Sequence, residues 1–515
     1  MLMRLTIKKQ LVKEFYGCYH HGCKKCFPDR KKKYEQTKER EQILESSGFT
    51  IERIWECEWN EIKSKLENKK EIEKQAIEQN IDIREALFGG RTEGFKKHVK
   101  CDENQVIYAF DVTSLYPTVN ALDDYAVGFK KYVKTSPEDI LSGKFFGLVK
   151  CDITPPKDLY LPVLPRNENH KLLFSLDEIK AKTFASVELK RALQEGYKIT
   201  KIYSALQYKK YNGLMKDYVA YFIKMKIENS GIMTDDECLE VNEYHKNLGF
   251  NFEIEKEDCK KNPGLRMISK ICLNSLWGKF GQRADLESYE FMDNYNNLLM
   301  KITDPKLETT RWDIINENCV ELRFKENRER AIAPEFISEI TAIFTTANAR
   351  VRLYDMLSWL HPSQIIYADT DSCYFLYDKT NPLHKKPDNN DMTLPKSVKF
   401  GDGLGCWKFE GLMDEMVVGG AKSYAYKTPE GKIAMAMKGI TLDLANCKIV
   451  NFDKVKRMVL VSETIETEAR YQFIWDRETK QIKTIEMSRK IQSTIHTKRN
   501  VVGMDTKPYG FVENI

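Results

Sequence analysis

The side chains best suited to chemistry are carboxylates in two short segments. Residues 364–377 read QIIYADTDSCYFLY, and the apolar, β-rich runs around Asp369 and Asp371 predict a β-hairpin with two acids in its turn. Taken alone, such a segment is more often an ordinary polar turn, because Asp side chains bond nearby backbone N–H groups. A second segment, YAFDVTSLYP at 108–117, brings Asp111 to a strand end. Acids on separate strands are the hard oxygen ligands with which proteins hold two Mg²⁺ ions for phosphoryl transfer.

A basic helix lies between the two acidic segments. The stretch NPGLRMISKICLNSLWGKFGQ at 262–282 predicts a helix, with Asn262 as N-cap. At 100° per residue, one side is apolar and expected to pack; it holds Leu265, Ile268, Cys272, Leu273 and Leu276. An adjacent face carries Arg266, Lys270, Asn274 and Trp277. Two cations one turn apart fit a triphosphate, and the amide and the aromatic ring fit a base pair. The alternative is a solvated basic face under an interfacial Trp.

A third segment, GGAKSYAY at 419–426, predicts a strand on which Lys422 and Tyr424 share one face. A lysine and a tyrosine placed in this way can hold a phosphate and a sugar together. The alternative is an ordinary exposed strand. The mildly basic stretch 476–515 fits a surface that follows a duplex backbone, although such a surface usually serves solubility.

The elements around these segments alternate between strands and helices. A strand is expected at 105–112, short strands with one helix at 151–207, and mostly helix at 212–282. A mixed stretch at 283–335 precedes a long helix at 336–359 that leads into the hairpin. The pattern is typical of an α+β protein with helical insertions.

Composition places the chain among ordinary globular proteins. Its 515 residues are 42% hydrophobic, and the net charge of +6 is too small to identify a polyanionic partner. Thirteen cysteines without a secretory leader indicate free thiols in a reducing, intracellular compartment, which the sequence does not resolve among nucleus, cytoplasm, mitochondrion and virus. No apolar run approaches the roughly 20 residues that span a bilayer, so no membrane partner is expected.

The order of these segments resembles one enzyme family. DVTSLYP, KICLNSLWGKFG, YADTDS and AKSY are similar to motifs A, B, C and Lys-x-Tyr of family B DNA polymerases, most of all the protein-primed branch, over about residues 85–515. The resemblance implies a right-hand fold with an antiparallel palm sheet, helical fingers and a thumb, beside a small N-terminal α/β module. The implied divisions are the module 1–75, a linker 76–100, palm 100–207 with an insertion at 120–150, fingers 208–282, a second insertion 283–335, palm 336–444, and thumb and tail 445–515.

The resemblance also implies roles for the acids. Asp111 and Asp371 would be the principal ligands of two Mg²⁺ ions, with the carbonyl of Val112 as a further ligand. Asp369 would be a supporting acid. The activity implied is DNA-templated addition of deoxynucleotides to a primer 3′ end or to a protein primer.

Nucleotide and primer contacts follow in the same way. Lys270 would grip the triphosphate with help from Arg266, while Asn274 lines the nucleotide pocket. Trp277 stands where many relatives have Tyr and would keep the stacking contact. Tyr116 matches the aromatic sugar gate, which excludes a ribose 2′-hydroxyl. The backbone N–H groups of Ser114 and Leu115 would contact phosphate. The side chains of Lys422 and Tyr424 would steady the primer terminus.

The expected partners are primer–template DNA, deoxynucleotides and a terminal protein acting as primer, bound by a monomer. In the protein-primed branch the two insertions contact the terminal protein and wrap the template. Relatives carry a 3′–5′ exonuclease upstream, and about 85 residues before the palm cannot contain one, so we expect a truncated product or an enzyme without proofreading. The loop LFGGRTE resembles the family's Tyr-x-Gly-Gly linker, but Leu87 replaces the Tyr.

The N-terminal block resembles a different family. EFYGCYHHGCKKCF and SSGFTIERIWECEW look like the zinc-bearing part of very-short-patch-repair endonucleases. A Cys₄ zinc site and unligated thiols are both open for Cys18, Cys23, Cys26 and Cys57. His21 matches a catalytic histidine of that family, but residues 1–17 contain no Asp to bind its metal, so a structural or DNA-contacting remnant is expected rather than a nuclease.

Two alternatives to a DNA polymerase fit the sequence less well. A reverse transcriptase or RNA polymerase would show a different acidic signature and no Asn-Ser-x-x-Gly helix after a lysine. A catalytically inactive nucleic-acid-binding remnant of a polymerase is disfavoured because all three carboxylates are present.

Overall fold

The computed structural model describes residues 4–6, 11–46, 50–64, 80–283, 286–326, 337–468, 470–476, 479 and 481–513. The chain divides into two compact units, Met1–Asn80 and Ile81–Ile515. Among the described residues, no helix has both the length and the apolar character that crossing a bilayer requires.

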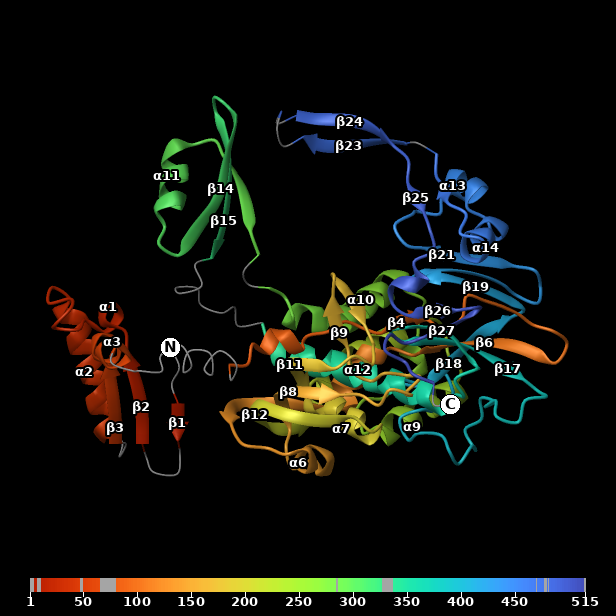
Figure 1. The fold of residues 1–515 in the computed structure, drawn as a ribbon, viewed down its shortest axis with the longest axis horizontal. Coiled ribbons are helices and arrows are strands. Elements are labelled where there is room, and N and C mark those ends of the chain that lie inside the picture. The colour runs from red at the N-terminus through yellow and green to blue at the C-terminus, as the bar shows by residue number, and fades with distance from the viewer. Residues whose placement is uncertain are drawn as a thin grey trace. The chain divides into compact units, whose positions relative to one another are not determined.

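The first unit is the expected small α/β module (Figure 1). Its sheet has the order β1-β2-β3, in which β2 (Leu11–Tyr16) runs antiparallel to β1 (Arg4–Thr6) and parallel to β3 (Thr50–Trp55). A parallel pair needs a crossover connection, and this part of the chain supplies it with helices. The helices are α1 (Cys18–His21), α2 (Lys31–Ser46) and, after β3, α3 (Glu56–Ser64).

The second unit is built on an antiparallel five-stranded sheet of order β18-β6-β17-β16-β4. Strand β6 (Gln105–Val112) is the strand expected at 105–112, and β16 (Ile365–Asp369) with β17 (Ser372–Asp378) forms the predicted hairpin, so both predictions are confirmed. The edge strands are β4 (Thr92–Gly94) and β18 (Trp407–Met413). The long helix α12 (Glu339–Trp359) is largely buried and leads into β16, as the sequence predicts.

A second sheet, of order β11-β8-β12-β7, shares a hydrophobic core with the first. Its strands are β7 (Asp124–Tyr132), β8 (Gly147–Thr154), β11 (Ile179–Ala185) and β12 (Lys198–Asn212). The helices beside them are α5 (Leu115–Leu122), α6 (Pro137–Ser142) and α7 (Ser186–Gln194), with short elements η2 (Ile83–Ala86), β9 (Arg166–Glu168) and β10 (Lys171–Leu173). The insertion expected at 120–150 is therefore not a separate element, because β7 and the start of β8 are strands of this sheet.

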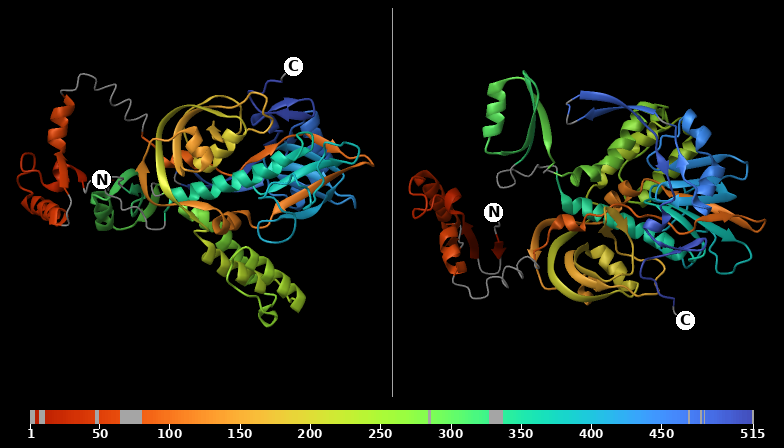
Figure 2. Two further views of the ribbon diagram at one scale, coloured as in Figure 1. Left: turned by 90° about the horizontal axis from the view of Figure 1, so that it is seen from below. Right: turned by 45° about the horizontal axis from the view of Figure 1, so that its top comes forward.

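Three helices lie in the range expected for the fingers and project from the sheets in Figure 2. They are α8 (Lys216–Glu228), α9 (Asp235–Asn247) and α10 (Pro263–Phe280), with the short η3 (Lys256–Asp258). The predicted α10 and its cap are confirmed, since the Asn262 side chain accepts from the Leu265 N–H. The predicted packing face is wrong in part: Leu273 is buried, whereas Leu265 and Ile268 are exposed, because this end of a projecting helix has fewer neighbours.

The mixed stretch after the fingers forms a small sheet of order β13-β15-β14 with one helix. Its elements are β13 (Ser288–Met292), α11 (Tyr295–Thr303), β14 (Leu307–Asn316) and β15 (Cys319–Glu326). The ends of the insertion expected at 283–335 lie partly outside the described residues.

A third sheet, of order β21-β20-β19-β5, completes the palm side. It contains β5 (His98–Lys100), β19 (Glu415–Gly420), β20 (Ser423–Lys427) and β21 (Ile433–Met437). The linker expected at 76–100 is thus shorter than predicted, because β4 and β5 are paired strands of two sheets.

The described C-terminal elements form two groups. The first group comprises α13 (Leu444–Ile449), α14 (Phe452–Leu460), β22 (Ile465–Glu466), β23 (Arg470–Asp476), β24 (Gln481–Met487) and β25 (Lys490–Ile491). The chain then returns through η4 (Ile495–Thr497), β26 (Asn500–Val502) and β27 (Asp505–Lys507) to the residues after β4, where the Thr506 N–H donates to the Phe95 carbonyl at 2.8 Å. This last part of the predicted thumb and tail therefore packs on the palm.

Candidate active site

The five-stranded sheet brings the two acidic segments together where β6 and β16 end and β17 begins. Asp111 pairs across β6 with Ser372 of β17 on one side and with Lys408 of β18 on the other. Asp371 lies in the turn just before Ser372, and its carbonyl accepts from the Val112 N–H at 2.7 Å. Two segments that are far apart in the sequence are thereby fixed side by side.

The turn that carries Asp371 is held in an unusual conformation. Thr370 has φ of 59°, in the left-handed region that β-branched residues rarely adopt. Its N–H donates to the Arg91 carbonyl at 2.6 Å, and the Asp371 N–H donates to the Asp369 carbonyl at 2.6 Å. These bonds fix the direction of the turn.

Burial and repulsion disfavour charge on the two carboxylates. The pKa of Asp111 is raised to about 7, first by burial and then by Asp371 and Glu410, with partial relief from two lysines. The pKa of Asp371 is raised by burial and by Asp369. In the described part of the chain, neither the Asp111 nor the Asp371 carboxylate accepts a hydrogen bond from another side chain. Divalent cations stabilise acids in such a setting, so this donor set fits Mg²⁺.

Asp369 has a different environment. Its carboxylate accepts from Thr92 Oγ1 at 2.8 Å, from the Tyr367 hydroxyl at 3.2 Å and from Lys422 Nζ at 3.2 Å. Protein donors therefore occupy both of its oxygens, which suits a supporting acid better than a principal metal ligand.

The aromatic residues expected at the nucleotide pocket are in contact. The Tyr116 and Trp277 ring centroids are 4.9 Å apart, with planes inclined by 31°. Tyr116 lies in the first turn of α5, which starts at Leu115. Ser114, with φ of 58°, precedes this helix.

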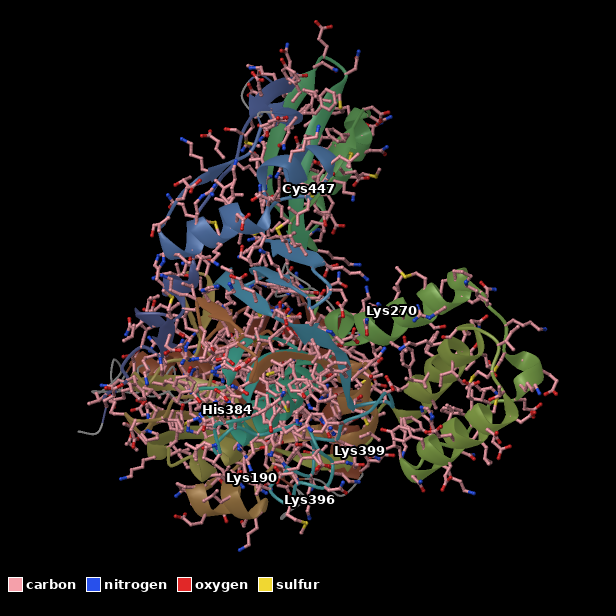
Figure 3. All side chains as sticks on the ribbon, turned by 90° about the vertical axis from the view of Figure 1, so that its right-hand side faces the viewer. Lys190, Lys270, His384, Lys396, Lys399 and Cys447 are labelled. Atoms are coloured by element: carbon pink, nitrogen blue, oxygen red, sulfur yellow. The ribbon has the colours of Figure 1, made fainter. Side chains whose placement is uncertain are left out.

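The predicted cations of α10 are exposed. In Figure 3 Lys270 lies where the fingers helices approach the sheets. The charge of Lys270 offsets part of the rise in the pKa of Asp111, so the two side chains lie near one another. Arg266 Nε donates to Ser230 Oγ at 3.2 Å, and Asn274 is exposed.

Lys422 and Tyr424 do not share a strand face as predicted. Lys422 has φ of 58° and lies in the turn between β19 and β20, because Gly420 already pairs with Ser423. Its N–H donates to the Tyr367 hydroxyl at 2.9 Å, and the Tyr424 ring lies 5.0 Å from that of Tyr367. Lys422 therefore contacts Asp369 directly through its Nζ, whereas Tyr424 packs on Tyr367, whose hydroxyl donates to Asp369.

Comparison with known proteins identifies the family. Residues 59–236 and 251–356, more than half of the chain, match the family described as "DNA polymerase type B, organellar and viral". The chain belongs to this family. The resemblance to family B polymerases is thereby confirmed.

Individual type B relatives are distant. The chain is 24% identical to a DNA polymerase of Kluyveromyces lactis over 361 residues, which are 67% of this chain and 31% of the relative. It is 22% identical to the Streptococcus phage Cp-1 DNA polymerase over 321 residues, 60% of this chain and 47% of the relative. The chain spans less than half the length of either relative.

The type B fold is also found among solved structures. Phi29 DNA polymerase complexed with primer-template DNA and incoming nucleotide has a TM-score of 0.52 and 18% identity, covering 81% of this chain and 63% of that chain. The binary complex with primer-template DNA has the same TM-score. The α+β right-hand fold is thereby confirmed.

Three residues of this site were missed in the sequence. Lys226 of α8 donates to Ser114 Oγ at 3.2 Å, and its pKa is lowered by burial and by the charges of Arg266, Lys270 and Lys408. A signal was present for Lys226, because it continues the stripe of buried Val219 and Ile223 on α8.

Lys408 and Glu410 of β18 gave no such signal, because only the pairing of β18 with β6 brings them to Asp111. Among the described residues, Lys226 thus lies near three further cations, Arg266, Lys270 and Lys408, and the last two also lie near Asp111. Two of them, Arg266 and Lys270, were predicted.

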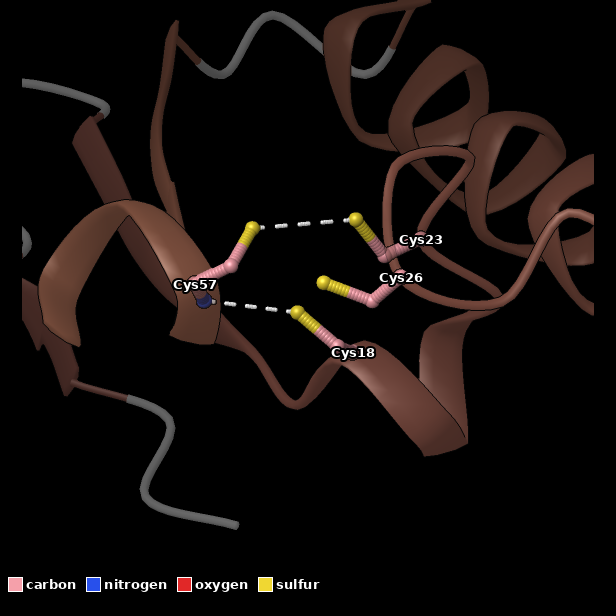
Figure 4. A group of neighbouring side chains, drawn as sticks. All are labelled: Cys18, Cys23, Cys26 and Cys57. Atoms are coloured by element: carbon pink, nitrogen blue, oxygen red, sulfur yellow. Dashed lines mark hydrogen bonds between the residues drawn. The ribbon is translucent and has the colours of Figure 1, made fainter. Parts of the chain in front are cut away.

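The first unit contains a separate cluster of four cysteines (Figure 4). The Sγ atoms of Cys18, Cys23, Cys26 and Cys57 all lie within 4.8 Å of one another. The Cys23 and Cys57 Sγ atoms are 3.8 Å apart, and the Cys57 N–H donates to Cys18 Sγ at 3.3 Å. Thiolates around one Zn²⁺ at about 2.3 Å are separated by about 3.8 Å in a tetrahedron, so the cluster fits that ion. His21 is nearby in sequence, with Nδ1 at 3.2 Å from Thr37 Oγ1.

Proposed function

We propose that this chain is a DNA-templated DNA polymerase that adds deoxynucleotides to a primer 3′ end. The observation that carries the proposal is the meeting of two half-buried carboxylates, Asp111 and Asp371, beside a group of cations made up of Lys226, Arg266, Lys270 and Lys408. Negative oxygens next to positive side chains suit a divalent ion on one side and a triphosphate on the other. Membership of the type B family supports the same activity.

Each group has a defined part in this reaction. Asp111, Asp371 and the Val112 carbonyl would hold two Mg²⁺ ions. Two ions held by these residues would lower the pKa of the primer hydroxyl and neutralise charge on the phosphates. Lys270 and Lys226 bind the triphosphate and orient its α-phosphorus toward the primer.

Primer extension by the purified chain tests this proposal, and a Lys270 variant tests the contribution of a single side chain. Lys270→Ala should raise the KM for deoxynucleotides at least about tenfold, because a charge-assisted contact to phosphate is lost. Lys279→Ala, on the same helix but bonded to Gln282, should leave KM unchanged. A wild type that binds primed DNA and never extends it would instead identify an inactive nucleic-acid-binding remnant.

Sugar selection should depend on the Tyr116 ring. Tyr116→Val should raise ribonucleotide incorporation relative to deoxynucleotide incorporation at least about tenfold, because the ring that packs on Trp277 no longer fills the 2′ position. Tyr116→Phe keeps the ring and serves as the control. The ratio is measured with matched rNTP and dNTP pairs, and an unchanged ratio in Tyr116→Val would reject the sugar-gate role.

Primer–template DNA and deoxynucleotides are the partners that this function requires. The similar phi29 polymerase structure contains both. The resemblance to the protein-primed branch supports a terminal protein as an alternative primer, bound by a monomer. Labelling of a candidate protein with radioactive dNTP, without a nucleic-acid primer, would test this partner.

We also propose that the four cysteines bind one structural Zn²⁺ ion. The purified chain should contain about one zinc per molecule, and Cys57→Ser should lose it, because three thiolates leave the tetrahedron incomplete. Cys447→Ser, an exposed cysteine of the second unit, is the matched control. Metal analysis decides the question, and a metal-free wild type prepared without chelators would end the proposal.

A further inference from the structure

One oxygen of Asp369 is held by a residue outside the sequence motifs. Thr92 of β4 pairs directly with Asp369 of β16, and its Oγ1 donates to Asp369 Oδ1 at 2.8 Å. Thr92 is buried, so water does not readily replace this bond. Asp369 lies two residues before Asp371, and its carbonyl accepts from the Asp371 N–H at 2.6 Å. The orientation of Asp369 therefore influences the acid that is expected to bind metal.

Strand β4 is too short to fix this orientation alone, because it has three residues and lies at the sheet edge. The returning C-terminal segment supplies the missing contacts. Lys498 Nζ donates to the Thr92 carbonyl at 2.9 Å. Thr506 Oγ1 lies 3.0 Å from each of the Gly94 and Phe95 carbonyl oxygens.

Buried charges join the same two segments. Arg499 and Glu93 have side chains that are 0% exposed, with 3.8 Å between their nearest charged atoms. Glu93 also accepts from Arg91 at 2.7 Å, and Arg499 Nε donates to Thr506 Oγ1 at 2.9 Å. Buried ion pairs add little stability but penalise every alternative arrangement in which a partner is lost. Such a network holds β4 in one position.

We propose that Thr92 is a positioning residue of the active site, and that the segment Ile495–Lys507 holds it against Asp369. The segment thus acts on the metal-binding acids through edge strand β4 rather than on DNA as part of the thumb. This inference rests on the proposed polymerase function. A merely structural role of Thr92 would affect folding alone. A positioning role predicts a change in the Mg²⁺ dependence of the reaction.

The test compares Thr92→Val with Thr92→Ser in primer extension at increasing Mg²⁺ concentration. Thr92→Val keeps the shape and loses the donor, so the Mg²⁺ concentration for half-maximal rate should rise about tenfold, the scale of one lost hydrogen bond to a charged group. The KM for deoxynucleotides should change less than twofold. Thr92→Ser retains the hydroxyl and should restore the wild-type Mg²⁺ dependence.

Lys498→Met provides a second variant that leaves Thr92 intact. It removes the bond to the Thr92 carbonyl and should shift the Mg²⁺ dependence in the same direction. If Thr92→Val fails to fold by circular dichroism, Lys498→Met alone decides. If folded Thr92→Val has the wild-type Mg²⁺ dependence, the inference is overturned. If Thr92→Val does not fold, a wild-type Mg²⁺ dependence in Lys498→Met overturns it. A wild type without any extension would contradict the polymerase function itself.

Discussion

Replacing Asp371 by asparagine should lower the rate of nucleotide incorporation by on the order of 1,000-fold, because the site loses one of its two principal metal-binding charges. Asparagine is nearly isosteric, so the turn fixed by Thr370 and Val112 should persist. Single-turnover primer extension measures the rate. Affinity for primed DNA, measured by fluorescence anisotropy, should stay within a few-fold of wild type because the phosphate-binding cations are unchanged.

Asp378→Asn is the matched control for this experiment. Asp378 ends the same strand, β17, but bonds Thr380 and Gln105 instead of facing Asp111. It should extend primers at the wild-type rate. Incorporation by Asp371→Asn above about a tenth of the wild-type rate would show that Asp371 is not a principal ligand.

A single added methyl group at Gly90 should reduce incorporation about 100-fold, because small displacements of reacting groups carry costs of this size. A Cβ at Gly90 would lie 2.7 Å from both Cγ2 and Oγ1 of Thr370, closer than these atoms can approach. Thr370 is held by the Arg91 carbonyl, so the clash must displace the turn that carries Asp371. Steady-state extension with saturating deoxynucleotide measures the effect on kcat.

The neighbouring glycine supplies the control. A Cβ at Gly89 meets nothing within 4 Å, so Gly89→Ala should keep wild-type activity. Equal activity of the two alanine variants would show that the loop can move without disturbing the acids. Equal loss in both would place the effect in backbone flexibility instead of in the contact with Thr370.

The parts of this site that could be predicted are those encoded by local pattern. Strand β6 and the β16–β17 hairpin follow from alternating apolar runs, and α10 follows from Asn262 at its N-cap. Because acids at strand ends meet when the strands pair, Asp111 and Asp371 could be placed together before the pairing was known.

The remaining parts depend on contacts between distant segments. Lys408 reaches Asp111 only through pairing of β18 with β6, and Thr92 reaches Asp369 only through pairing of β4 with β16. No sequence period encodes such pairings. Lys422 was misplaced because the sequence predicts a single strand at 419–426, whereas Lys422 lies in the turn between β19 and β20.

Template-directed incorporation of single nucleotides is the most direct measurement of the proposed polymerase activity. The purified chain would be given a primed template and Mg²⁺, with one of the four deoxynucleotides at a time, for each of the four template bases. We predict one-nucleotide extension with the complementary deoxynucleotide in all four cases, and none in the Asp111→Asn variant. If the wild type binds the primed template and gives no extended product, the proposed polymerase function is contradicted.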